Sequence, residues 1–350
     1  MIRLWRWLSS VMLLILLLSG QVKAQIPPGY YDSADNLWGD SLRTALHQII
    51  DDHTVLSYAS LWTHFRATDS KPDSTVWDMY ADQPSGTPAY SYSFGVDQCG
   101  NYAQEGDCYN REHSFPKSWF GDAPPMNTDL FHLYPVDGYV NGRRGNYPYG
   151  EVGNASWISS NGSRLGNASL PGYGGVVFEP IDEYKGDLAR AYFYMLIRYL
   201  PHIASWSSPM LQDDTLALWA KKMLLQWALT DTVSMKELDR NNAVFILQGN
   251  RNPFIDHPEF IDYIWGNKKP NTSTNSYMMT KLRCWSANNR VHWSGVLSYG
   301  KLLIYDISGK LLLIEEVLDE NGSMDLAGFS GVIFVHLEAD GHKIVSKVML

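Results

Sequence analysis

The sequence predicts an α+β protein in which a mostly helical domain is followed by a small all-β sandwich domain. Apolar residues recur with the helical period in much of residues 25–268. Residues 269–283 are polar, contain Pro, Ser and Thr, and lack a periodic apolar pattern, which is typical of a linker. Beyond them, in residues 284–350, the apolar pattern alternates as it does in strands. A chain of 350 residues is long enough for one large and one small domain.

The first 24 residues are typical of a secretory signal peptide. Two arginines precede the apolar run Val11–Leu18, and Val22–Ala24 ends in a small-x-small cleavage pattern. Because the apolar run is too short to span a membrane comfortably, we expect cleavage of residues 1–24 rather than an uncleaved anchor. The mature protein would begin near Gln25, have no stable membrane span, and pass through the periplasm to the medium or the cell surface.

The composition is that of an ordinary globular protein, with 45% hydrophobic and 19% charged residues. The formal net charge of −9 excludes a protein that binds nucleic acid through bulk positive charge. It does not exclude an enzyme whose cations are confined to one groove. We expect a monomer.

Cysteine is scarce for an exported protein, with three residues. Cys99 and Cys108 lie close together with two glycines between them, which suits a small disulfide-closed loop in an oxidising compartment. Cys284 is left over, either as a buried free thiol or without explanation. A zinc site is not expected, because no CxxC pair or second cysteine–histidine cluster accompanies these residues.

Two helical regions flank an irregular one. Residues 25–90 are predicted to be mostly helical, with an apolar stripe formed by Leu42, Ala45, Leu46, Ile49 and Ile50. Residues 91–175 are rich in Gly, Asn, Tyr and Pro, and such a long stretch of short strands and loops usually holds a functional site. In residues 176–268 we predict a mostly buried helix over Ala191–Tyr199, an amphipathic helix over Leu211–Leu229 and another over Ser234–Gln248.

Two hairpins are predicted in the C-terminal domain. Lys301–Leu313 has the pattern strand, Ser-Gly turn, strand. Gly331–Leu350 has the pattern of a second hairpin that turns at Asp340 and Gly341. A small β-sandwich over residues 284–350 follows from these pieces.

The central region concentrates groups that suit metal-assisted cleavage of a phosphodiester. Glu112 offers a carboxylate oxygen and Asn141 an amide oxygen to a hard divalent cation. So few protein ligands would leave room for water and phosphate, as a catalytic ion requires. On a strand, His113 would face away from Glu112 and be free to accept a proton from water. Arg143 and Arg144 are candidates for binding phosphate.

Each of these groups has a plainer explanation when it is taken alone. A Glu-His pair is usually a surface pair, an Arg-Arg pair is usually solvated, and an asparagine most often caps a helix or fills a turn. Their occurrence together in one Gly- and Asn-rich region favours a functional site.

Longer motifs decide between these interpretations. The runs Cys108–Pro116, Thr128–Pro135 and Val140–Asn146 resemble the bacterial endonuclease I family, whose members contain the ββα-metal (His-Me finger) nuclease motif. Further matches lie at Phe178–Pro180, Lys185–Arg190 and Gln248–Phe254. The resemblance covers most of residues 28–266.

This resemblance implies roles for individual residues. The family's general base falls on His113, and its metal-binding pair falls on Glu112 and Asn141. Base and carboxylate would come from a strand and the amide from the following helix, for which Asp137 is placed as the N-cap. Arg144 matches the arginine of the family's Asn-Gly-x-Arg-Gly-Asn run and would clamp the phosphate.

Three further residues are candidates for supporting the site. His132 falls in the second strand of the motif, where members carry Asn or His, and we expect a supporting group rather than a second base. Arg143 is a second phosphate-binding candidate. Arg190 either reaches the active site or forms an ion pair with Glu179, Asp182 or Glu183. Some members carry another phosphate-contacting arginine in an insertion that this chain lacks.

The resemblance therefore implies a secreted, largely sequence-nonspecific endonuclease that hydrolyses DNA, RNA or both. It would use a histidine base and one divalent ion, Mg²⁺, with Ca²⁺ or Mn²⁺ as alternatives. Two other classes stay open. One is a catalytically inactive secreted protein that binds nucleic acid or a surface, and the other is a metal-dependent phosphoesterase that acts on small phosphate esters.

The C-terminal domain has a resemblance of its own. Leu303–Lys310, Gly331–Leu337 and Lys347–Leu350 are similar to the C-terminal sorting domain of the type IX secretion system. This resemblance implies the type IX machinery as a partner and a second export step, after which such a domain is often removed. A generic β-sandwich that binds carbohydrate or packs on the enzyme is the alternative.

Overall fold

A computed structural model describes residues 26–266, 268–270, 283–287, 289–294, 300–307, 309–317, 319, 321–339 and 342–349. Two compact units are present, Met1–Pro270 and Asn271–Leu350. The predicted signal peptide and most of the predicted linker lie outside the described residues. Within the described ranges, no helix is long and apolar enough to cross a membrane.

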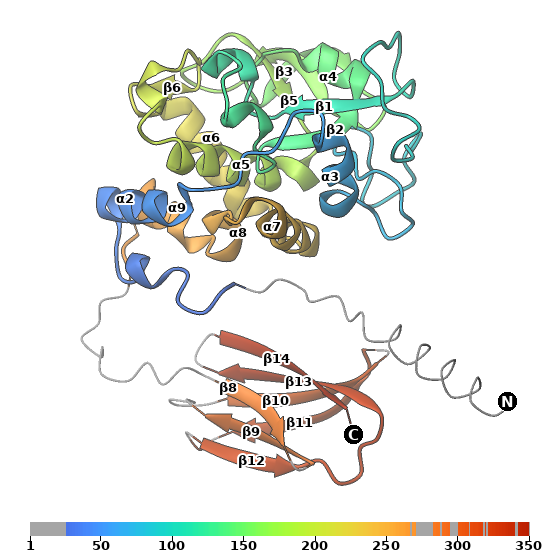
Figure 1. Ribbon diagram of the computed structural model, residues 1–350, viewed down its shortest axis with the longest axis vertical. Coiled ribbons are helices and arrows are strands. Elements are labelled where there is room, and N and C mark those ends of the chain that lie inside the picture. Colours follow the sequence, from blue (N-terminus) through green and yellow to red (C-terminus); the bar gives the residue numbers. More distant parts are fainter. Residues whose placement is uncertain are drawn as a thin grey trace, which may run out of the picture. The chain divides into compact units, whose positions relative to one another are not determined.

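The first unit is built around a central helix, α5 (Lys185–Arg198), in which every residue is buried. It packs against α2 (Gly39–Ile50), α6 (Leu218–Thr230) and α8 (Pro253–Asp256), as Figure 1 shows. The other α-helices of this unit are α3 (Leu61–Thr68), α4 (Gly138–Arg144), α7 (Met235–Gln248) and α9 (Glu259–Ile264). Short 3-10 helices occur at Asp32–Ala34, Lys117–Phe120, Met126–Thr128, Asp182–Tyr184 and Ile203–Ser205. The buried helix predicted over Ala191–Tyr199 is confirmed as part of α5.

The first predicted helical region is only partly helical. The stripe on α2 is confirmed, with Leu42, Ala45, Leu46 and Ile50 buried and Ile49 packed against the core. Between the end of α3 and residue 90, however, the chain makes turns and isolated bridges such as Ser70 with Val76. Prolines and a glycine interrupt this stretch, and proline removes the N–H that a helix needs. The expectation of a mostly helical 25–90 region was therefore wrong beyond α3.

The helix predicted over Leu211–Leu229 is also shorter than expected. A small hairpin of β6 (Leu211–Gln212) and β7 (Thr215–Leu216) precedes α6. Asp213 in its turn has φ 55°, a left-handed conformation that a helix cannot contain. The helix over Ser234–Gln248 is confirmed as α7, whose N-cap Ser234 forms a capping box with Glu237.

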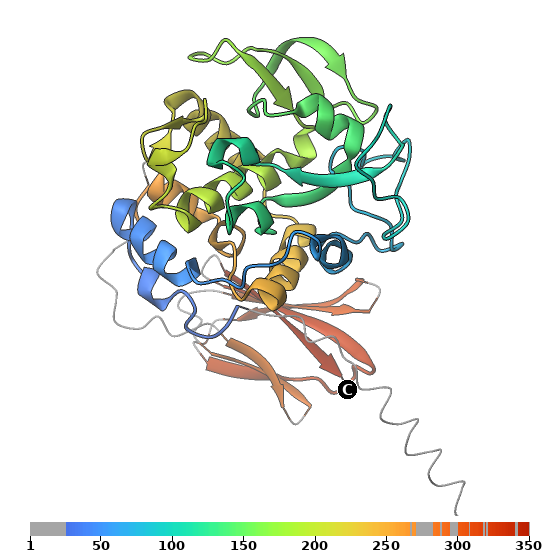
Figure 2. The ribbon, with the colours of Figure 1, turned by 45° about the horizontal axis from the view of Figure 1, so that its top comes forward.

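Two small sheets lie at one end of this unit. Strands β1 (Tyr109–His113) and β2 (Leu133–Asp137) pair antiparallel, with Glu112 opposite Tyr134. Helix α4 follows β2 directly. A second antiparallel sheet, β3 (Val152–Ile158), β4 (Arg164–Ala168) and β5 (Val176–Glu179), lies beside α4, as Figure 2 shows in green.

The second unit contains two sheets around one apolar core. One has the order β11-β10-β13-β14 and the other the order β12-β9-β8. These strands are β8 (Arg283–Ala287), β9 (Arg290–Ser294), β10 (Gly300–Asp306), β11 (Leu311–Val317), β12 (Asn321–Asp325), β13 (Val332–Ala339) and β14 (His342–Met349). Both predicted hairpins are present as β10–β11 and β13–β14, although Asp340 and Gly341 lie outside the described residues. Side chains of both sheets share the core, including Trp293, Ile304 and Val335. The predicted order, a helix-containing α/β domain and then a β-rich region, is confirmed.

Candidate functional site

Strand β1 presents Glu112 and His113 to opposite faces, because successive side chains of a strand alternate. Glu112 faces α4, where it meets Arg144. His113 faces the other way, toward Asn127 and His132. Both side chains are buried, with relative exposures of 3% and 6%. The separation of the two groups that was predicted from the sequence is therefore present.

Glu112 is held by two donors on one oxygen. Its Oε1 accepts a hydrogen bond from the Tyr80 hydroxyl at 2.7 Å and from Arg144 Nη1 at 2.9 Å. Tyr80 in turn is 2.7 Å from the Tyr149 hydroxyl. Burial raises the pKa of Glu112, while Arg144 and Tyr80 act in the opposite direction. The carboxylate is thus fixed in one orientation by residues that are themselves buried.

One hydrogen bond fixes the orientation of the His113 ring. Its Nε2 lies 3.1 Å from the backbone oxygen of Asn127. A carbonyl oxygen can only accept, so Nε2 carries the proton and the neutral ring has its lone pair on Nδ1. Burial, and next the neighbouring His132, lower the pKa of His113 to about 3. The imidazole is therefore uncharged at neutral pH, as a proton acceptor must be.

His132 packs near the His113 ring. It is fully buried, its Nε2 is 2.7 Å from the Met126 backbone oxygen, and its ring centroid is 5.6 Å from that of His113. No hydrogen-bond partner of His132 Nδ1 is found among the described residues. A side chain so deeply buried contacts His113 rather than a solvent-borne molecule.

Helix α4 carries Asn141 to the Glu112 side of β1. Asp137 caps this helix as predicted, since its side chain accepts from Val140 N at 2.7 Å. Asn141 Nδ2 donates to the backbone oxygen of Arg111 at 3.2 Å. Because the amide nitrogen makes this bond, the amide oxygen of Asn141 is the atom that can meet a cation.

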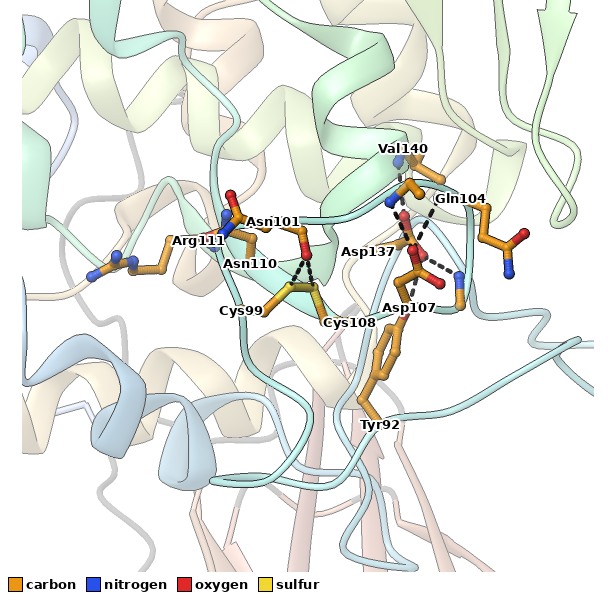
Figure 3. Close-up of a disulfide and its surroundings, with 12 residues drawn as sticks. Tyr92, Cys99, Asn101, Gln104, Asp107, Cys108, Asn110, Arg111, Asp137 and Val140 are labelled. Carbon is orange, nitrogen blue, oxygen red and sulfur yellow. Dashed lines mark hydrogen bonds between the residues drawn. A yellow bond between two sulfur atoms is a disulfide. The ribbon is translucent and has the colours of Figure 1, made fainter.

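A disulfide-closed loop supports α4. Cys99 and Cys108 form the predicted disulfide, and Asp137 lies near it in Figure 3. Asp137 Oδ2 accepts from the loop's Gly106 N at 2.8 Å and from Tyr92 Oη at 2.7 Å. The backbone of Gly138 donates to the Cys108 oxygen at 2.9 Å. The loop is thereby attached to the first turn of the helix that carries Asn141. Cys284 is a free thiol.

Arg144 is placed differently from the phosphate-binding cation expected from the sequence. It is 1% exposed. Besides Glu112, its Nη1 donates to the His113 backbone oxygen at 2.8 Å, and its Nη2 donates to the Ser114 backbone oxygen at 2.6 Å. The guanidinium also lies 4.6 Å from the centroid of the Tyr149 ring. Both terminal nitrogens of Arg144 are therefore engaged at the end of β1 and the residue that follows it.

The other two arginines lie in contrasting places. Arg143 is exposed on α4, and its guanidinium is 5.3 Å from the Trp157 ring centroid. Arg190 is fully buried and makes two hydrogen bonds to Glu237, at 2.5 and 2.8 Å. The ion-pair partners considered from the sequence were Glu179, Asp182 and Glu183. Glu179 instead pairs with Lys185 and Arg164, so Arg190 belongs to a separate buried ion pair.

Sequence reasoning did not single out Tyr58, Tyr80 or Arg111. Tyr58 stacks on His113 with an interplanar angle of 16° and a centroid distance of 6.2 Å. The Arg111 guanidinium lies 3.8 Å from the Tyr58 ring centroid. The alternation rule could have placed Arg111 on the His113 face of β1. The two tyrosines come from segments distant in the sequence, and no pattern near them predicts that they contact β1.

The donor set at Glu112 and Asn141 fits a hard divalent cation. One carboxylate and one amide oxygen are the oxygen ligands that Mg²⁺ and Ca²⁺ prefer. In the part of the chain that the structure describes, no group of three or more His, Cys, Asp and Glu side chains is placed to bind a metal ion. A cation here would accordingly rely on few protein ligands and complete its shell with water.

An imidazole on one face of β1, and a carboxylate on the other with an amide on the following helix, are groups that suit hydrolysis of a phosphodiester. The family model of endonuclease I matches residues 38–259. The chain therefore belongs to the endonuclease I family and is a nuclease. Members of this family generally depend on a divalent metal ion.

Curated relatives agree with this assignment. The chain is 36% identical over 246 residues to an extracellular ribonuclease of Bacillus subtilis, covering 67% of this chain and 78% of the relative. It is 32% identical over 131 residues to endonuclease-1 of Buchnera aphidicola, covering 37% and 46% respectively. It is 28% identical over 137 residues to an extracellular deoxyribonuclease of Aeromonas hydrophila, covering 37% and 50%.

Proposed function

We propose that β1, β2 and α4 form a ββα-metal nuclease motif, with His113 as general base and with Glu112 and Asn141 as ligands of one Mg²⁺ ion. The observation that carries this proposal is the tautomer of His113. The Asn127 carbonyl keeps the proton on Nε2, which leaves the Nδ1 lone pair for an attacking water. Proton transfer to such a base contributes roughly 10²–10⁴-fold in rate.

The surrounding residues keep this base in place. His132 and Tyr58 both pack near the imidazole, which restricts rotation of the ring. Tyr80 and Arg144 fix the Glu112 carboxylate, and the bond to the Arg111 carbonyl fixes the Asn141 amide. A bound divalent ion supplies Lewis-acid stabilisation of the negative charge on the phosphate.

The proposed substrate is the sugar–phosphate backbone of DNA, RNA or both, cleaved with little sequence preference. The relatives include two named ribonucleases and two named deoxyribonucleases, which supports a polymer substrate without choosing between DNA and RNA. Contacts to backbone rather than to base edges give affinity without sequence information. Ca²⁺ and Mn²⁺ are the alternative ions.

We further propose secretion of the enzyme as a monomer. The signal peptide over residues 1–24 and the relatives named extracellular or periplasmic support export. The catalytic domain would span residues 25–268. The domain over residues 284–350 would direct the protein to the type IX secretion machinery, after a linker over residues 269–283.

The test is digestion of plasmid DNA and of RNA by the full-length protein, with Mg²⁺ and with EDTA. Cleavage of either polymer with Mg²⁺, and its loss in EDTA, is expected. His113→Ala should lose at least 100-fold in rate, whereas the exposed His202→Ala should keep the wild-type rate. Two intact polymers would indicate an inactive binding protein. Hydrolysis confined to small phosphate esters would indicate the phosphoesterase.

A further inference from the structure

We propose that Arg111, stacked on Tyr58 and Trp62, is the cation that binds a substrate phosphate next to His113. This inference rests on the proposed nuclease function and adds a substrate-contacting residue to it. Cleavage of a polyanion requires a cation near the base, and the burial of Arg144 leaves that position open to another residue.

The strand geometry places Arg111 on the correct side. It lies two residues before His113 on β1, so both side chains leave the same face of the strand. Arg111 is only partly buried, which gives it access to solvent. In Figure 3 its side chain extends away from the disulfide and from Asp137. Arg143, by contrast, is carried by α4 and lies over Trp157.

Aromatic rings hold the Arg111 guanidinium in a fixed place. Its carbon Cζ is 3.8 Å from the Tyr58 ring centroid and 4.4 Å from that of Trp62. Its Nη1 donates to the Tyr58 backbone oxygen at 2.9 Å. Because Tyr58 also lies nearly parallel to the His113 ring, one tyrosine positions both the cation and the base.

Among the described residues, no carboxylate lies within salt-bridge distance of the Arg111 guanidinium. Its Nη1 donates to the Tyr58 backbone oxygen, and no hydrogen bond of its Nη2 is found among these residues. A guanidinium has five N–H donors in a planar fork that matches phosphate oxygens. Arg144, by contrast, is paired with Glu112. Arg111 therefore has both the charge and the donors to receive a phosphate.

The experiment compares Arg111→Ala and Arg111→Lys with a matched control, Arg66→Ala, in the full-length protein. Arg66 makes the same two kinds of contact, with the ring and backbone oxygen of Phe94. For Arg111→Ala we expect kcat/KM on DNA to fall at least 10-fold and the slope of log(1/KM) against log[salt] to decrease in magnitude by about 0.9 on duplex DNA. Arg111→Lys should restore the slope but only part of kcat/KM, because an ammonium cannot form the planar fork. Arg66→Ala should change neither.

An Arg111→Ala enzyme with wild-type kcat/KM and an unchanged salt slope would overturn the proposal. A lowered melting temperature with an unchanged slope would do the same, because it would show that Arg111 acts only in packing. If Arg111→Ala does not fold, Arg111→Gln removes the charge while keeping a long side chain, and the same criteria apply. Failure of the proposed function is separate: there the wild-type protein would cleave neither polymer.

Discussion

Arg144 Nη1 donates a hydrogen bond to Glu112 Oε1 at 2.9 Å, and both side chains are buried. The same guanidinium binds the backbone oxygens of His113 and Ser114. The last turn of α4 is thereby attached to the end of β1. A single arginine thus fixes the strand that carries the proposed metal ligand and the proposed base.

Arg144→Met should strongly destabilise the protein. It leaves the Glu112 carboxylate buried without its cation, which typically costs about 3–5 kcal/mol. In the double variant Glu112→Gln/Arg144→Met no charge is left behind, so the loss should be smaller than the sum of the single losses. The free energy of unfolding from urea titrations measures this coupling. Strictly additive losses would contradict the positioning role of Arg144.

Mg²⁺ should stabilise the protein through Asn141 and Glu112. An ion that binds only the folded state adds about 2.7 kcal/mol at 100 times its Kd, so the melting temperature should rise with Mg²⁺ and fall back with EDTA. Asn141→Ala should weaken this response, because it removes the amide oxygen. Asn146→Ala, an exposed asparagine shortly after the same helix, is the control and should respond as the wild type does. Equal responses of all three proteins would place the ion elsewhere.

Stability should fall in mild acid because of three buried histidines. Burial lowers the pKa of His53, His113 and His132 below the usual 6.5. Below pH 6.5 the unfolded chain therefore binds more protons than the folded protein does. The free energy of unfolding consequently decreases as the pH falls. Each histidine contributes a slope of up to about 1.4 kcal/mol per pH unit.

Urea titrations between pH 5 and 7 would measure this slope. His132→Gln should make it shallower, whereas the exposed His202→Gln should leave it unchanged. The same slope for both variants would show that burial of His132 does not govern the acid sensitivity. Asp129, whose pKa is lowered, acts in the same direction but only at lower pH.

Gly142→Ala should fail to give the stabilisation that this change usually brings inside a helix, roughly 0.5–1 kcal/mol. A Cβ at Gly142 would lie 2.7 Å from the hydroxyl oxygen of Tyr102, a residue of the disulfide-closed loop. The clash should move Tyr102 away from α4, or move α4 together with Asn141, and lower both the melting temperature and the activity. In the Tyr102→Ala background the same Gly142→Ala change should raise the melting temperature. An increase in both backgrounds would show that Tyr102 does not press on this helix.

Local sequence signals predicted local structure well. The cap at Asp137, the helix over Ser234–Gln248, the apolar stripe of α2 and the hairpins of the second unit are all present. Each depends on neighbours a few residues apart, which the sequence displays directly. Where turn-forming residues interrupt an apolar pattern, as between α3 and residue 90 or before α6, the pattern overstated the helix.

By itself, the sequence determined the class of the protein, since several runs between Cys108 and Phe254 occur in the order of the endonuclease I family. Only the tertiary structure decided what each cation does. Arg143 and Arg144 are adjacent on one helix, yet one is exposed and the other is enclosed by Glu112 and two backbone oxygens. The reason is physical: burial and hydrogen-bond partners come from segments far apart in the chain, such as Tyr58 beside His113, and no local pattern specifies them.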